Sequence, residues 1–174
     1  MKGLRSVLIF GVDVKTPKDD VGSSAMLESG PCIQAIKLLK SHLPQANFKI
    51  DVLSFTLSLV IKINPSDWMK SALRKHQFRN RYQLLIAADV CLCPYSNTGH
   101  CSVFTKEGHM DNQASIDQLA TIAAAYAKAG ADVIAPSDMM DGRIGAIKAK
   151  LTQEGYGSRV SVLSYSAKAR VFII

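Results

Sequence analysis

The chain has 174 residues, of which 48% are hydrophobic and 20% are charged, and this composition suits one globular domain rather than a disordered tail. The longest aliphatic segment, 52–63, is interrupted by polar residues and falls short of the roughly 20 apolar residues that a membrane-spanning helix needs. The formal net charge of +7 is concentrated in segment 48–83, where seven basic and two acidic residues supply five of the positive charges. We therefore expect neither a membrane protein nor a nucleic-acid partner.

Hydrophobic periodicity predicts an alternation of strands and helices along the chain. Strands are expected over 6–12, 84–90, 132–135 and 160–165. Helices are expected over 31–42, 113–129 and 142–154, with Pro31 at the first helical position and Gly130 and Gly155 as helix ends. Segment 48–83 is more basic than its flanks and holds the only tryptophan, so we interpret it as an insertion that lies outside the rest of the fold.

Strands separated by crossover helices pair in parallel, so the predicted class is α/β. The pattern alone is compatible with a doubly wound sheet or with a (β/α)₈ barrel. No glycine-rich phosphate-binding loop follows any strand, whereas polar residues cluster after three of them, and this favours the barrel. A barrel has eight strands and about 250 residues. Four predicted strands and three helices make residues 1–174 a single, incomplete barrel domain interrupted at 48–83.

Cysteine usage predicts a reducing compartment, which we interpret as the cytoplasm. Four cysteines in a chain of this length do not form a disulfide scaffold, and Cys91 and Cys93 are too close together to form a bridge. The apolar stretch 7–12 imitates a secretory signal, but it is too short and no small-residue cleavage pattern follows it.

A group of cysteines follows the second predicted strand in the segment DVCLCPYSNTGHC. Side chains on an extended backbone alternate, so Asp89, Cys91 and Cys93 point the same way, and Cys101 can fold back toward them. Three thiols without an obvious fourth ligand are typical of a zinc site that keeps one position open. Buried free cysteines that serve as small hydrophobic residues are the alternative. His100 is a candidate ligand, a group behind the ligands, or a plain loop histidine.

Two further segments hold candidate site residues. In APSDMMDGR, Asp141 or Ser137 can cap the following helix, or the carboxylates and the hydroxyl can hold an amine or shuttle protons. Capping explains Asp138 less easily. In SYSAK, Lys168 follows an uncharged strand end. A lysine in a dry pocket loses its charge and can form a Schiff base with a ketone, although a solvated lysine is the ordinary interpretation.

Five segments carry a resemblance to a known family: VLIFGV, PKDDVGSSA, LIAADVCLCPYSNTGHC, AYAKAGADVIAPSDMMDGRIGAIKAKL and SRVSVLSYSAK. They occur in the family's order and cover nearly all of the chain outside 48–83. The chain resembles porphobilinogen synthase, also called 5-aminolevulinate dehydratase, in its zinc-dependent branch. The resemblance implies a TIM barrel, a homo-oligomer that is usually an octamer, and a lyase that condenses two 5-aminolevulinate molecules to porphobilinogen in haem and tetrapyrrole biosynthesis.

The resemblance also implies roles for individual residues. Cys91, Cys93 and Cys101 match the three thiolate ligands of the zinc, and His100 matches a further metal position in some members. Lys168 resembles the first of two active-site lysines and is the expected catalytic residue. We expect contacts with the substrate from Asp89, Ser137, Asp138 and Tyr165.

Several family features have no counterpart in these 174 residues. They are the second active-site lysine, the arginines that hold substrate carboxylates, and the N-terminal arm that drives oligomer assembly. We therefore expect the chain alone to bind zinc without turning over substrate. The alternative interpretation is a catalytically inactive zinc-binding fragment that arises from mis-splicing or a faulty gene model.

Overall fold

The computed structural model describes residues 6–11, 16–42, 59–63 and 84–165. Its strands are β1 (Ser6–Gly11), β2 (Leu59–Ile63), β3 (Leu85–Val90), β4 (Val103–Phe104), β5 (Met110–Asp111), β6 (Val133–Pro136) and β7 (Ser161–Val162). Its helices are the 3₁₀ turn η1 (Ser23–Met26) and the α-helices α1 (Pro31–His42), α3 (Asn112–Ala129) and α4 (Arg143–Gln153). Within these ranges, no helix is both long and apolar enough to cross a membrane.

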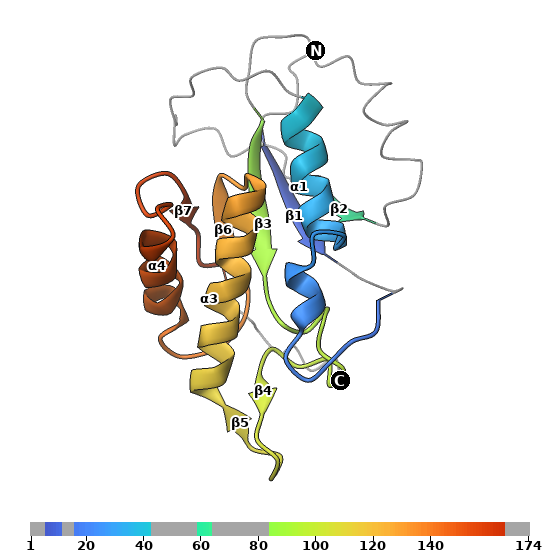
Figure 1. Ribbon diagram of the computed structural model, residues 1–174, viewed down its shortest axis with the longest axis vertical. Helices are drawn as coiled ribbons and strands as arrows, with labels where there is room; N and C mark the ends of the chain where they lie inside the picture. Colours follow the sequence, from blue (N-terminus) through green and yellow to red (C-terminus); the bar gives the residue numbers. More distant parts are fainter. Residues whose placement is uncertain (1–5, 12–15, 43–58, 64–83, 166–174) are drawn as a thin grey trace, which may run out of the picture.

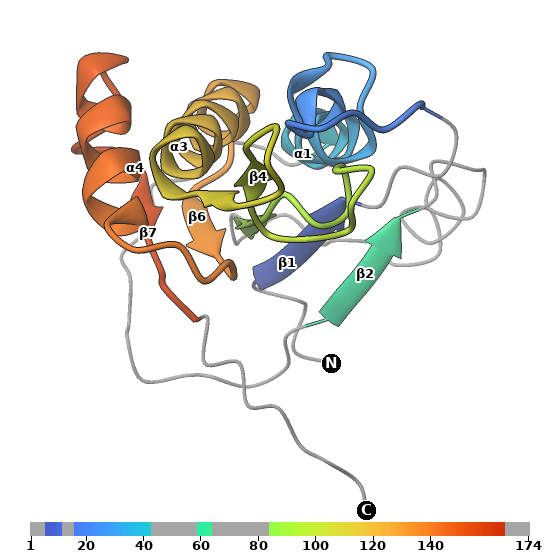
Figure 2. The same ribbon diagram turned by 90° about the horizontal axis from the view of Figure 1, so that it is seen from below.

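One parallel sheet organises the molecule, with strand order β2-β1-β3-β6-β7 (Figure 1). A separate two-stranded antiparallel hairpin pairs β4 with β5. The α-helices α1, α3 and α4 lie on the same side of the sheet (Figure 2). This arrangement confirms the predicted α/β class. Because the strands are parallel, their carboxyl ends meet at one edge, and the residues that follow β3, β6 and β7 are brought together there.

The core lies between the sheet and its helices. Five of the six β3 residues and all four β6 residues are buried, as expected for aliphatic strands of a parallel sheet. Ile86 and Ile134 of these strands pack in the same cluster as Leu119, Ile122 and Ile147 of the helices. Burial of each such side chain contributes about 1.5–3 kcal/mol, so the strands that carry the site are among the best anchored elements.

The helix ends follow local rules, with one departure from expectation. Helix α1 begins at Pro31, whose missing N–H is not needed in the first turn, and α3 ends at Ala129 with Gly130 as its C-cap, which has a φ of 111°. Helix α4 is preceded by Gly142 with a φ of 79°, and no side chain caps its first turn. The capping interpretation of Asp141 and Ser137 is therefore wrong, since the glycine backbone makes this turn.

Part of segment 48–83 belongs to the sheet. Strand β2 runs parallel to β1, with pairs from Val7 and Leu59 to Gly11 and Ile63. The prediction that the whole segment lies outside the fold is wrong for these residues, and the sheet formed by the described ranges has five strands instead of four. The physical reason is the edge of β1, whose backbone N–H and C=O groups are satisfied when an aliphatic segment pairs with them. Residues 48–58 and 64–83 lie outside the described ranges.

Candidate metal centre and the groups beside it

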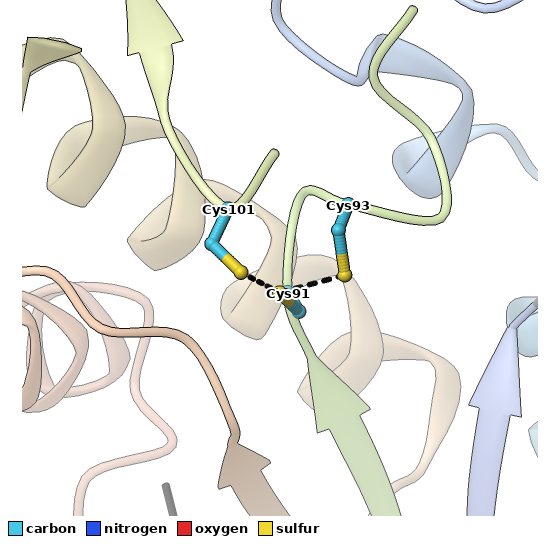
Figure 3. Close-up of side chains that lie close together, drawn as sticks. All are labelled: Cys91, Cys93 and Cys101. Carbon is cyan, nitrogen blue, oxygen red and sulfur yellow. Dashed lines mark hydrogen bonds between the residues drawn. The ribbon is translucent and has the colours of Figure 1, made fainter. Parts of the chain in front are cut away.

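Three cysteine thiols meet just beyond the carboxyl end of β3 (Figure 3). The Cys91 sulfur lies 3.2 Å from the Cys93 sulfur and 3.2 Å from the Cys101 sulfur. All three sulfurs lie within 4.8 Å of one another. The structure therefore brings together the three thiols that the sequence spacing predicted.

A tight turn folds the cysteine loop back on itself. The Tyr95 N–H donates to the Leu92 carbonyl at 2.9 Å, and Gly99, with a φ of 68°, reverses the chain before Cys101. The Tyr95 side chain is buried, and its oxygen accepts a hydrogen bond from the Tyr126 hydroxyl of α3 at 3.1 Å. The loop is thus anchored to the helix layer, which places its thiols at a defined point above the sheet.

The donor set fits a zinc ion. With Zn–S bonds of about 2.3 Å, tetrahedral coordination places the sulfurs roughly 3.8 Å apart, and the separations here of 3.2 Å to at most 4.8 Å bracket that spacing. Hydrogen bonds with Cys101 and Cys93, together with burial, raise the pKa of the Cys91 thiol. A bound cation would offset the cost of placing thiolates so close together. Thiolates also select soft metals over magnesium or calcium.

The other histidine and cysteine candidates lie apart from this group. His100 is exposed, and its ring packs edge-on against Phe104 with centroids 5.5 Å apart. Among the described residues, the group of candidate metal ligands contains the three thiols without His100, whose metal role stays a prediction. Cys32 is buried in the core, where desolvation raises its pKa to about 12.

Asp89 and Tyr165 form a pair next to the thiols. Asp89, on β3, is only 6% exposed, and it pairs with Ala135 in the register of β3 and β6. Beyond β7 the chain continues along β6, so that the Tyr165 N–H donates to the Pro136 carbonyl at 3.4 Å. The Tyr165 hydroxyl then donates to the Asp89 carboxylate. Burial and the Asp89 carboxylate raise the pKa of Tyr165, whereas a hydrogen bond with Ser137 acts in the opposite direction.

Asp138 is completely buried in the turn between β6 and α4. One carboxylate oxygen accepts a hydrogen bond from the Met140 N–H at 2.8 Å, and the other lies 3.2 Å from Nε of Arg143. Burial raises the pKa of Asp138, and the Arg143 charge opposes this shift. The predicted contact between Asp138 and the substrate stays a prediction.

Sequence reasoning missed Arg143 as a site residue. A signal was present, because a buried carboxylate needs a cationic partner and Arg143 is the first basic residue after Asp138. Lys168, the predicted catalytic residue, lies outside the described ranges.

The chain is similar to known dehydratases over most of its length. The family described as delta-aminolevulinic acid dehydratase matches residues 61–172, beginning inside segment 48–83. The Bos taurus delta-aminolevulinic acid dehydratase is 43% identical over 167 residues, which are 96% of this chain and 39% of that protein. The Pongo abelii protein is 44% identical with the same coverage, and the Dictyostelium discoideum protein is 41% identical over 168 residues, again 96% and 39% of the two chains. The chain thus spans about two fifths of the length of these relatives.

A solved structure shares the fold. The delta-aminolevulinic acid dehydratase of Toxoplasma gondii, crystallised with the reaction product porphobilinogen, superposes with a TM-score of 0.60 over 95% of this chain and 47% of that one. At 22% identity this likeness speaks for the fold, and it confirms the prediction of a partial barrel. Since the family match covers more than half of the residues, the chain belongs to the delta-aminolevulinic acid dehydratase family.

Proposed function

We propose that the chain carries the zinc-binding part of a porphobilinogen synthase active site. The reaction would be the condensation of two 5-aminolevulinate molecules to porphobilinogen in haem and tetrapyrrole biosynthesis. Family membership supports this proposal. The observation that carries it is the group of three thiols at the carboxyl end of β3, beside the buried carboxylate of Asp89. Active sites of barrel enzymes lie at this end of the strands.

Different residues would supply the metal ligands, the negative charge and the proton that the reaction needs. Cys91, Cys93 and Cys101 would hold a zinc ion, which when bound supplies a Lewis acid that polarises a substrate carbonyl. Asp89 offers a buried negative charge to a substrate amine. Tyr165 holds its proton toward Asp89, and its raised pKa keeps it a donor across the physiological range. The pair is therefore suited to hold or move one proton beside the metal.

Three further parts of the proposal rest on the sequence. Lys168 takes part in imine or proton chemistry with the substrate ketone, as its match to a family lysine implies. The chain works in the cytosol, a compartment that suits its four free cysteines. Assembly into a homo-oligomer, which the family resemblance implies, is tested by light scattering on the purified protein.

Metal binding is tested with cobalt(II), because thiolate ligands give it an intense near-ultraviolet absorption. The wild-type chain should bind about one cobalt or zinc ion, matching one tetrahedral site. Cys91→Ser should remove the absorption and the bound metal. Cys32→Ala is the matched control: Cys32 lies in the core, so its replacement should leave metal binding intact. Unchanged metal stoichiometry in Cys91→Ser would show that the site assignment is wrong.

Substrate binding is tested by calorimetric titration of the zinc-loaded chain with 5-aminolevulinate. Asp89→Asn should weaken binding, because it removes the negative charge offered to the amine. Equal affinity in wild type and variant would contradict the role of Asp89. Colorimetric detection of porphobilinogen, with Lys168→Ala as control, checks the expectation that these 174 residues alone bind without turnover. Turnover that Lys168→Ala abolishes would overturn that expectation.

A further inference from the structure

Arg143 connects two segments that follow neighbouring strands. It is the first residue of α4, and its Nε lies 3.2 Å from the buried Asp138 carboxylate. Its Nη1 donates to the Met140 carbonyl at 3.0 Å, and its Nη2 donates to the Ser164 hydroxyl at 3.4 Å. One guanidinium therefore joins the turn after β6 to the residue that immediately precedes Tyr165.

The geometry of this link suits a fixed support. Asp138 is 0% exposed, so its carboxylate acts on its neighbours inside the turn rather than on solvent. A buried carboxylate holds its cationic partner strongly, because separation would leave either charge unpaired in a poorly solvated place. The planar guanidinium directs Nη1 and Nη2 in fixed directions toward Met140 and Ser164, which a lysine ammonium does not, while Nε lies against the Asp138 carboxylate as an ion pair without a hydrogen bond. Arg143 is thus held from the Asp138 side and can hold Ser164 on the other.

We propose that Asp138 and Arg143 are positioning residues that hold Tyr165 against Asp89. Tyr165 needs such a support, because β7 has only two residues and Tyr165 is 36% exposed. The sequence of contacts runs from Asp138 to Arg143, then to Ser164, whose neighbour Tyr165 donates to Asp89. The importance of this support for the reaction rests on the proposed function, but the support itself is a property of the chain.

The test reads the surroundings of Tyr165 directly. The chain has five tyrosines, so 3-fluorotyrosine labelling gives a simple ¹⁹F NMR spectrum, in which Tyr165→Phe and Tyr156→Phe assign two resonances. Arg143→Met should shift the Tyr165 resonance, and Arg143→Lys should give a smaller shift. Arg159→Met is the matched control, because it removes the same charge near the opposite end of β7. The Arg159 guanidinium lies 5.1 Å from the Tyr156 ring centroid, so this variant should move the Tyr156 resonance and leave Tyr165 unchanged.

The buried Tyr95 and Tyr126 resonances report whether each variant is folded. If Arg143→Met unfolds the chain, Ser164→Ala decides the question, because it removes the hydroxyl that Arg143 contacts and leaves the Asp138 pair in place. A Tyr165 resonance that stays unmoved in the folded Arg143 variant, or in Ser164→Ala when that variant decides, would overturn the proposal. The measurement needs neither zinc nor 5-aminolevulinate, so its failure is distinguishable from failure of the proposed function, which the Cys91→Ser metal analysis tests.

Discussion

Replacement of Gly11 by alanine tests the packing beneath the cysteine loop. Gly11 ends β1, and a Cβ atom at this position would lie 1.6 Å from the Tyr95 hydroxyl oxygen and 3.0 Å from Cβ of Cys32. Real Cβ atoms do not approach this closely, so the Tyr95 ring must move. Tyr95 is only 2% exposed, so any movement of its ring disturbs the packed core around it.

Two terms set the magnitude of the loss. The displaced Tyr95 oxygen no longer accepts the hydrogen bond of the buried Tyr126 hydroxyl. The Cys32 thiol also hydrogen-bonds with Tyr126, so the cost is that of one lost hydrogen bond, about 0.5–1.5 kcal/mol. Overpacking of a filled core costs about 1–3 kcal/mol more. The free energy of unfolding should therefore fall by roughly 1.5–4.5 kcal/mol, well beyond the ~0.5 kcal/mol typical of surface substitutions.

Urea denaturation of the folded variants measures this loss. Gly145→Ala is the matched control, because its added Cβ meets no atom within 4 Å other than the adjacent backbone of its own helix, and alanine favours the helix. Removal of the hydroxyl in a Tyr95→Phe background should reduce the cost of Gly11→Ala. Cobalt absorption should also weaken in Gly11→Ala, since Tyr95 lies in the loop between the candidate ligands Cys93 and Cys101. A loss below about 1 kcal/mol, or no relief in the Tyr95→Phe background, would refute the reasoning.

Three other changes to the chain have defined outcomes. Asp132→Ala should lower the free energy of unfolding in urea by about 1–3 kcal/mol, because it leaves the Ile86 N–H without its carboxylate acceptor. Lys40→Met should lower it by at most about 1 kcal/mol, because it removes only a partly exposed ion pair with Asp132. The pKa of Asp138 is raised on folding, so its contribution to stability is full below its ordinary pKa and is lost as pH rises through the folded value. Asp138→Asn should remove this dependence from a pH series of urea midpoints. Deletion of 59–63 should lower the unfolding midpoint and increase light scattering, because it uncovers the edge of β1; a more soluble deletion variant would contradict this.

Elements with local signals were predictable from the sequence. Pro31 marks the first residue of α1, because proline lacks the backbone N–H that later helical positions need. Gly130 marks the end of α3, because glycine readily adopts the positive φ of a helix cap. The three thiols were predictable for a similar reason. They lie within a short stretch, but β3 ends at Val90 and a turn, not an extended strand, brings Cys93 to Cys91, so the expected alternation of side chains is wrong at this point.

Features that depend on distant partners were not predictable. Strand β2 exists because β1 offers an edge to it, and nothing within 59–63 specifies that neighbour. The last strand was expected over 160–165, but β7 is confined to Ser161–Val162, and the chain beyond it follows β6 through separate backbone hydrogen bonds. The contact of Arg143 with Ser164 was not predictable, because it arises only once β6 and β7 lie side by side, whereas its contact with Asp138 is local to the turn after β6.

The contacts of the candidate site join residues at very different separations along the chain, so they can form at different times during synthesis. The sulfurs of Cys91 and Cys101 are 10 residues apart, whereas the contact between Tyr165 and Asp89 spans 76 residues. Closure of a loop of about 10 residues takes about 10–100 ns, and the longer loop costs about 2 kcal/mol more in entropy, at about 0.6 kcal/mol for each doubling. A chain emerging from the ribosome can therefore bring its three thiols together once residue 101 is outside. The hydrogen bond between Tyr165 and Asp89 can form only after residue 165 has emerged and the intervening strand β6 has paired with β3.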